Sequence, residues 1–180
     1  MVPPPLARPV APPAQASSLW SLPPSALRSI ARTLAAAAGE LGHPGAGAER
    51  DWRLVAESEA FEAWLIPWPA NGRLELHDHG GSRGVVSVVT GCLVETSVVH
   101  VGDRLALRTR TVNSATRPLS IGVNRIHDVT NPGPGVAVSV HVYSPRLTAM
   151  TFFDLANDEL RARRTEYLGG THEATGRRAS

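Results

Sequence analysis

The stretch 136-VAVSVHVYSP-145 carries the strongest structural signal in the chain. Successive side chains of a β-strand point to opposite faces of the sheet. One face of this stretch therefore carries Val136, Val138, Val140 and Val142, and the other carries Ala137, Ser139, His141 and Tyr143. The valines predict a buried face. Polar side chains on the opposite face are tolerated in a buried strand only when they bond to one another or to a bound group. We call Ser139, His141 and Tyr143 the polar file, and it points to a functional site.

Short runs with a period of two occur along the rest of the chain, separated by Gly, Asn, Asp and Pro. Including the stretch above, strands are expected over 63–68, 73–79, 85–89, 93–99, 104–112, 119–123 and 136–143. Short strands at such regular spacing are typical of an antiparallel barrel or sandwich. The predicted fold is all-β, an antiparallel β-barrel of the jelly-roll type.

Helical spacing occurs near the N-terminus, where Leu27, Ile30, Ala31 and Leu34 predict a short helix over 26–38 with Ser25 as its N-cap. A second short helix is expected over 155–164. The Pro/Ala-rich residues 1–20 are expected to form a disordered tail. A single domain is expected over 21–165, followed by a flexible C-terminal tail over 166–180.

The composition limits the functional class. The chain has 180 residues with a net charge of +2, and 42% of them are hydrophobic, which is enough for a core. No apolar run approaches the ~20 residues of a membrane span, and the scattered basic residues favour no nucleic-acid surface. The proline-rich N-terminus is unlike a secretory signal, so we expect a cytoplasmic protein, and a monomer. The single cysteine, Cys92, excludes an internal disulfide and a cysteine-only metal site.

Two histidines are spaced for a metal site. His77 and His79 leave the same face at the end of the 73–79 strand, and His127 is a third candidate. Imidazoles held on rigid backbone are common ligands of first-row metals. The alternative is that His77-Asp78-His79 forms a solvated turn before a pair of glycines.

Together these motifs resemble a known family. The spacings Gly72-x4-His77-x-His79-x11-Gly91 and Gly122-x4-His127-x3-Asn131 resemble the two cupin motifs. The glutamate usual in the first motif would fall near Arg83, which leaves three histidines and no carboxylate. This substitution is similar to that in thiol dioxygenases. The string 139-SVHVYSP-145, with Trp68 nine residues before His77 and with Gly91-x3-Glu95-Thr96, resembles cysteine dioxygenase of the bacterial type over residues 52–154.

The resemblance implies a cupin domain that is a non-haem iron(II) thiol dioxygenase, oxidising L-cysteine to cysteine sulfinic acid with O2. By this resemblance His77, His79 and His127 would bind Fe(II). Ser139, His141 and Tyr143 would form a relay whose tyrosine hydroxyl lies near the substrate, and Arg53 would bind the substrate carboxylate. Three neutral imidazoles would leave the iron its full charge, which favours an anionic thiolate. The mammalian enzymes carry a cysteine cross-linked to the tyrosine, and the matching position here is Gly84, so no cross-link is expected.

Other interpretations remain open. The substrate could be 3-mercaptopropionate or another small thiol, although that subgroup carries glutamine where Arg53 stands. A non-catalytic cupin that binds a metal or a metabolite is a second alternative. A third is a cupin isomerase or decarboxylase holding manganese, nickel or zinc, because imidazole binds several divalent ions. Arg53 could also be a surface residue, and His141 and Tyr143 a satisfied pair in the core.

Overall fold

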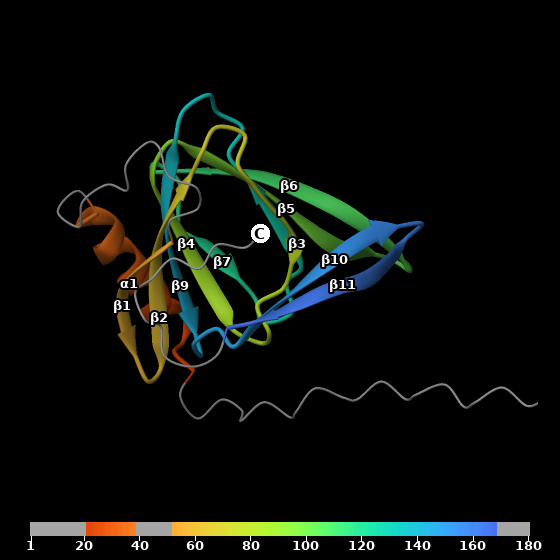
Figure 1. Ribbon diagram of the computed structural model, residues 1–180, viewed down its shortest axis with the longest axis horizontal. Helices are drawn as coiled ribbons and strands as arrows, with labels where there is room; N and C mark the ends of the chain where they lie inside the picture. The colour runs from red at the N-terminus through yellow and green to blue at the C-terminus, as the bar shows by residue number, and fades with distance from the viewer. Residues whose placement is uncertain (1–20, 39–51, 169–180) are drawn as a thin grey trace, which may run out of the picture.

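The computed structural model describes residues 21–38 and 52–168. In this part of the chain the strands form two antiparallel sheets that face each other (Figure 1). The five-stranded sheet has the order β1 (Arg53–Ser58), β2 (Phe61–Trp68), β9 (Ala137–Ser144), β4 (Arg83–Thr90) and β7 (Leu119–Ile121). The six-stranded sheet has the order β11 (Glu159–Tyr167), β10 (Ala149–Ala156), β3 (Arg73–His77), β8 (His127–Thr130), β5 (Cys92–Val101) and β6 (Arg104–Asn113).

The chain alternates between the sheets from β2 to β5, as in a jelly roll. The prediction of an all-β antiparallel fold of the jelly-roll type with a short N-terminal helix is therefore confirmed. The two sheets do not close into a continuous barrel, because no strand of one pairs with a strand of the other among the described residues.

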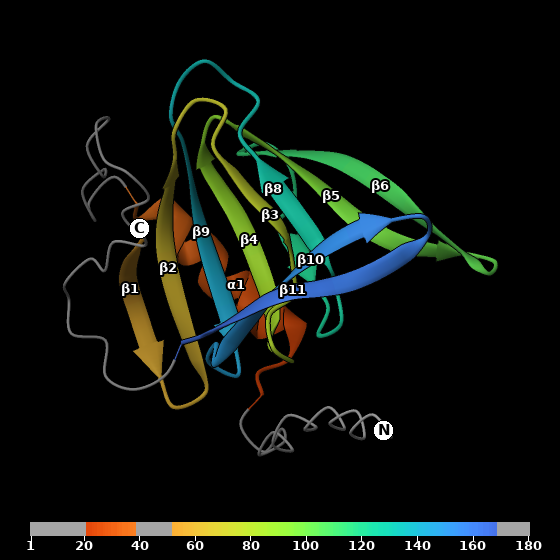
Figure 2. The same ribbon diagram turned by 45° about the vertical axis from the view of Figure 1, so that its right-hand side comes forward.

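Strand β9 is the centre of the five-stranded sheet and is buried along its whole length. Helix α1 (Pro24–Ala36) covers the outer face of this sheet (Figure 2). Leu27 and Ala31 of the helix pack against Val138, Val140 and Val142. The prediction of a buried valine face is confirmed for these three valines, and the opposite face of β9 looks into the space between the sheets.

The main core lies between the two sheets. Trp68 and Val86 come from the five-stranded sheet, whereas Leu74, Val129 and Phe152 come from the six-stranded sheet, and all are buried in one cluster. Side chains that point inward from either sheet therefore meet in a closed apolar interior, and this interior holds the functional site.

The structure corrects several predicted elements. The helix begins at Pro24, and its N-cap is Pro23 rather than Ser25, so no side chain caps it. The helix predicted over 155–164 is wrong, because β10 and β11 form a hairpin there. Its turn contains Asn157 and Asp158 at φ 53° and 61°. Adjacent residues of positive φ suit a tight hairpin turn and end a helix.

Four strands were not predicted, namely β1, β8, β10 and β11. The predicted C-terminal tail begins too early, since Glu166 and Tyr167 are the last residues of β11. The rest of that tail and the predicted N-terminal tail lie outside the described residues. None of the described segments is a helix long and apolar enough to cross a membrane.

Candidate metal centre

The structure brings His77, His79 and His127 together in one buried group, which we call the histidine cluster. His77 ends β3 and His127 begins β8, and the two are direct partners across these strands. His79 follows β3 in the turn to β4. The ligand nitrogens all lie within 4.8 Å of one another, and each histidine is 1% exposed. Pairing of β3 with β8 therefore unites two sequence motifs that lie far apart in the chain.

Hydrogen bonds set the orientation of two of these rings. Nδ1 of His77 lies 2.7 Å from the backbone oxygen of Glu75, and Nδ1 of His127 lies 3.0 Å from Oε1 of Glu95. Both partners are acceptors only, so each ring carries its proton on Nδ1 and presents a lone pair on Nε2. Nε2 of His77 is 3.2 Å from Nε2 of His79. Among the described residues Nε2 of His127 has no hydrogen-bond partner, and neither has Nδ1 of His79.

These unpaired nitrogens fit a bound metal ion. Buried polar atoms in proteins are almost always paired, and converging imidazole lone pairs suit a divalent first-row metal. Burial, with a smaller contribution from His127, lowers the pKa of His77 to about 3. Burial and the neighbouring histidines lower the pKa of His79 in the same way. Both rings are therefore neutral near pH 7, and neutral imidazole is the form that binds metals.

Glu95 orients His127 through the hydrogen bond to Nδ1 of its ring. Its carboxylate is 1% exposed and lies 2.5 Å from Nε of Arg110 and 3.5 Å from Nη1 of Arg125. Burial raises the pKa of Glu95, but hydrogen bonds from His127 and Arg110 outweigh burial and lower this pKa to about 2. The carboxylate is thus anionic. Sequence reasoning noted Glu95 as a family match without giving it a role, and the signal was a lone acid in the strand 92-CLVETSVVHV-101.

The polar file faces the histidine cluster from the other sheet. Nε2 of His141 lies 2.9 Å from Oγ of Ser139, and Nδ1 of His141 lies 3.0 Å from the hydroxyl of Tyr143. The ring centroid of Tyr143 is 5.0 Å from that of His79. Burial lowers the pKa of His141 to about 3, with a smaller contribution from His127. Burial and the charge of Glu62 raise the pKa of Tyr143 far above its usual range, so its hydroxyl stays protonated.

Gly84 lies against the ring of Tyr143, as the sequence predicted. The two are partners across β4 and β9, and a Cβ built on Gly84 would lie 3.0 Å from Cδ1 of Tyr143. A larger residue at this position would displace the ring. Cys92 is a free thiol at the start of β5, in the other sheet.

Arg53 does not join this group. It is exposed, and its partner across β1 and β2 is Leu65, which packs in the cluster beneath α1. Directly opposed residues of an antiparallel pair share a face. The neighbouring pair Leu54 and Trp64 lies on the same face as His141. The register therefore places Arg53 on the outer face of the sheet, away from the histidine cluster.

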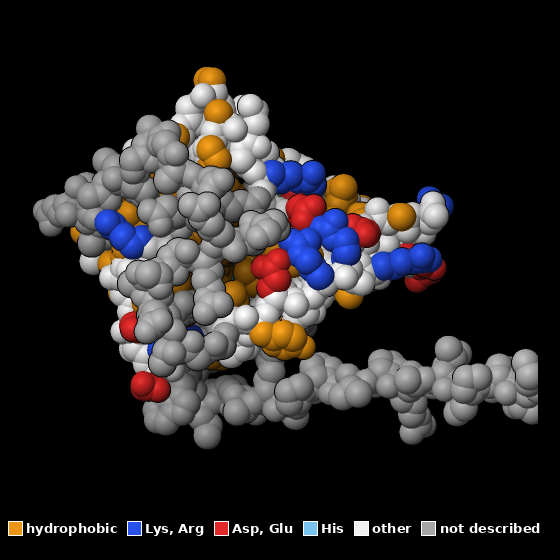
Figure 3. Space-filling model, in the orientation of Figure 1, with side chains coloured by type: hydrophobic (Ala, Val, Ile, Leu, Met, Phe, Trp, Pro, Cys, Tyr) orange, Lys and Arg blue, Asp and Glu red, His pale blue; other side chains and the backbone are white. Residues whose placement is uncertain are grey.

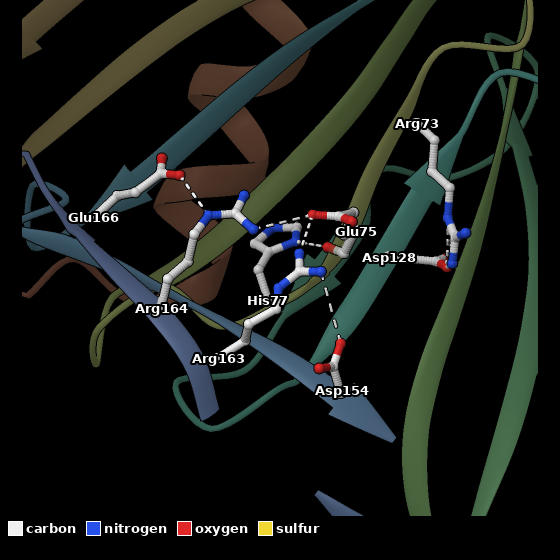
Figure 4. Close-up of polar contacts among 8 residues, drawn as sticks. All are labelled: Arg73, Glu75, His77, Asp128, Asp154, Arg163, Arg164 and Glu166. Atoms are coloured by element: carbon white, nitrogen blue, oxygen red, sulfur yellow. Dashed lines mark hydrogen bonds and ion pairs between the residues drawn. The ribbon is translucent and has the colours of Figure 1, made fainter. Parts of the chain in front are cut away.

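Ion pairs connect the β10–β11 hairpin to β3, close to His77. Figure 4 shows Arg163 and Arg164 of β11 directed at Glu75. The guanidinium carbon of Arg164 also lies 3.7 Å from the ring centroid of Phe152, and Phe152 is the partner of His77 across β10 and β3. Basic and acidic side chains lie side by side over this hairpin (Figure 3). These contacts hold the segment whose Glu75 carbonyl orients His77.

The chain matches one family model and is similar to several solved structures. A family model described as cysteine dioxygenase type I matches residues 47–156. Among solved structures, a recombinant oxalate oxidase in complex with glycolate is 13% identical over 62% of this chain and 60% of that chain, with a TM-score of 0.49. A double-stranded β-helix protein from Klebsiella pneumoniae is 16% identical over 59% of this chain and 80% of that chain, with a TM-score of 0.46.

A further oxalate oxidase, solved with the substrate analogue glycolate, is 18% identical with a TM-score of 0.42, and the match covers 46% of this chain and 41% of that chain. The present chain therefore spans less than half the length of that protein. The family match covers more than half of the chain and includes both the histidine cluster and the polar file. The chain belongs to the cysteine dioxygenase type I family.

Proposed function

We propose that the protein is an iron-dependent thiol dioxygenase that oxidises L-cysteine to cysteine sulfinic acid with O2. The observation that carries this proposal is the histidine cluster, in which three buried imidazoles converge next to Tyr143 and Nε2 of His127 has no hydrogen-bond partner among the described residues. Family membership and the three histidines support a metal-dependent oxygenase of the cupin type. The proposed enzyme acts as a cytoplasmic monomer on a free small-molecule thiol.

The roles of the residues follow from their chemistry. His77, His79 and His127 would hold Fe(II). When bound, the iron would supply the redox chemistry that a reaction between a thiolate and O2 requires. No carboxylate belongs to the ligand set, so the ion keeps its full charge and favours an anionic sulfur ligand. The hydroxyl of Tyr143, positioned by His141 and Ser139, would hydrogen-bond the substrate.

Recognition of the substrate carboxylate is a separate part of the proposal. The assignment of this role to Arg53 depends on the family resemblance, and Arg53 lies on the outer face of its sheet. Because Arg53 lies there, it does not favour L-cysteine over 3-mercaptopropionate as the substrate. Dioxygenation of 3-mercaptopropionate is therefore the second candidate function.

Oxygen consumption with detection of the sulfinate product tests both candidates. The purified full-length protein is depleted of metal, loaded anaerobically with Fe(II) and assayed with L-cysteine, 3-mercaptopropionate and cysteamine. We expect turnover of L-cysteine and none after loading with zinc, which is redox-inert. A preference for 3-mercaptopropionate would select the second candidate. Stoichiometric iron without oxidation of any of the three thiols would favour a non-catalytic cupin or a different cupin enzyme.

A further inference from the structure

The polar file continues beyond Ser139 to the indole of Trp68. Nε1 of Trp68 lies 2.8 Å from Oγ of Ser139, and Trp68 is 5% exposed on the strand next to β9. An indole N–H donates a hydrogen bond and cannot accept one. The serine oxygen at this end of the file is therefore already satisfied as an acceptor.

The hydrogen bond from Trp68 determines where the hydroxyl of Ser139 donates its own hydrogen. Ser139 has no exposed surface, so its own hydrogen needs an acceptor inside the protein. Nε2 of His141, at 2.9 Å, is the acceptor that the described residues provide. A neutral imidazole that accepts at Nε2 carries its hydrogen on Nδ1. Nδ1 of His141 then donates to the hydroxyl oxygen of Tyr143 at 3.0 Å.

The reverse direction of hydrogen bonding is less favourable. In that case Tyr143 would donate to Nδ1 of His141, and Nε2–H of His141 would donate to Ser139. The serine oxygen would then receive two hydrogens, while its own hydrogen had no acceptor at a position with no exposed surface, which is costly. In the forward direction the hydrogen left over is that of Tyr143, whose ring lies beside His79, where a bound substrate can accept it. In the forward direction each hydrogen bond also polarises and strengthens the next. The low pKa of His141, caused mainly by burial, keeps the ring neutral, so only one of the two directions applies at a time.

We propose that Trp68 is a positioning residue that sets the direction of hydrogen bonding along the polar file, so that Tyr143 presents its hydroxyl hydrogen to the metal centre. Tyr143 then acts as a hydrogen-bond donor to the substrate. The direction itself does not depend on the proposed function, whereas its consequence for the thiol reaction rests on it.

The tautomer of His141 tests the direction without any turnover. The full chain is labelled with nitrogen-15 and loaded with zinc, and long-range proton–nitrogen spectra report which imidazole nitrogen is protonated. The His141→Gln variant assigns the signal. We expect hydrogen on Nδ1 of His141. Hydrogen on Nε2 in the unaltered protein would overturn the proposal.

Replacing Trp68 tests whether its indole N–H sets the direction of hydrogen bonding along the polar file. In Trp68→Phe the serine oxygen loses its donor, and we expect the Nε2–H tautomer of His141 to gain population. In the iron-loaded enzyme we expect kcat to fall about 10-fold with unchanged metal content, which is typical for loss of an outer-shell contact. An unchanged tautomer in folded Trp68→Phe would overturn the proposal.

Trp64→Phe is the matched control. It makes the same change on the same face of β2, where Trp64 is the direct partner of His141, and it leaves the bond between Trp68 and Ser139 in place. The His141 tautomer should stay on Nδ1 in this variant, and an equal shift in both variants would contradict a specific role of Trp68. If the tautomers behave as expected but no thiol is oxidised, the proposed function fails and this inference stands.

Discussion

The histidine cluster and the polar file are two buried groups of three polar residues on opposite sides of the interior. They differ in how many of their side-chain nitrogens and oxygens have hydrogen-bond partners. Every side-chain nitrogen and oxygen of the polar file has a hydrogen-bond partner. In the histidine cluster, Nε2 of His127 and Nδ1 of His79 have none among the described residues. Because buried polar atoms are rarely left unpaired, the histidine cluster requires a further group, whereas every nitrogen and oxygen of the polar file already has a partner within the protein.

The two regions also differ in what holds them. The polar file is part of one chain of hydrogen bonds, which runs from Trp68 through Ser139 and His141 to Tyr143. The histidines are supported separately from behind, His127 by the carboxylate of Glu95 and His77 by a backbone carbonyl. An anionic partner makes an imidazole a stronger ligand than a neutral one does. The histidine ligands are therefore unequal, and His127 is the best supported.

The largest expected effect comes from breaking the histidine cluster. His127→Ala should abolish oxygen consumption and stoichiometric metal binding, because two imidazoles remain for the ion. The polar file lies on the other sheet, so the fold should persist, which far-ultraviolet circular dichroism checks. His100→Ala, at an exposed histidine of β5, is the control and should behave as the unaltered protein. Full metal occupancy in His127→Ala would show that the cluster is not the binding site.

Breaking the polar file should separate chemistry from metal binding. Tyr143→Phe removes the hydroxyl at the end of the polar file, on a ring that lies beside His79, and we expect kcat to fall about 100-fold, as for loss of a positioned acid–base group. The metal content, measured by plasma mass spectrometry, should not change. Loss of metal from Tyr143→Phe would mean that the two regions are not independent.

Glu95→Gln should weaken metal binding about 10- to 100-fold, because it removes the anionic partner of a ligand. Competition with a coloured chelator measures the affinity. Glu62→Gln is the matched control, because Glu62 is as buried as Glu95 but bonds the backbone of Leu147 and no ligand. Equal losses in both variants would indicate a general effect of buried charge.

The buried histidines should make the metal-free protein sensitive to acid. The folded-state pKa of His77 and of His141 is lowered to about 3, whereas an unfolded histidine titrates near pH 6.5. The unfolded chain therefore binds more protons between these limits, and stability is lost as the pH falls through them. Each such histidine should cost about 2 kcal/mol between pH 7 and pH 5. Urea unfolding measures this loss, and His141→Gln should reduce it, whereas an unchanged pH dependence would contradict a neutral His141.

The smallest effect is expected for Arg53→Ala. Because Arg53 is exposed on the outer face of the five-stranded sheet, kcat/KM for L-cysteine should change less than about twofold, as for most substitutions away from a site. Loss of a bidentate carboxylate contact would instead lower kcat/KM by roughly 30- to 1000-fold. A decrease of that size would show that Arg53 reaches the substrate and that β1 differs in register from the present structure.

The local sequence pattern was sufficient to predict the features that depend on residues close together in the chain. Alternation along β9 separates the valines from Ser139, His141 and Tyr143, and the structure buries these two sets on opposite faces. This separation follows from the period of a strand, which is contained in a few consecutive residues. His77 and His79 also lie in one group as predicted, but the strand ends at His77 and His79 reaches the group from the turn that follows.

The tertiary structure decided which residues lie opposite each other. Pairing of β3 with β8 brings His127 to His77, pairing of β5 with β8 places Glu95 behind His127, and pairing of β2 with β9 puts Trp68 beside Ser139. The register of β1 against β2 turns Arg53 outward, and the 155–164 segment forms part of a hairpin because its turn residues adopt positive φ. Alternation assigns a residue to one of two faces. What that face meets depends on strand register and sheet stacking, which are set by contacts between distant parts of the chain.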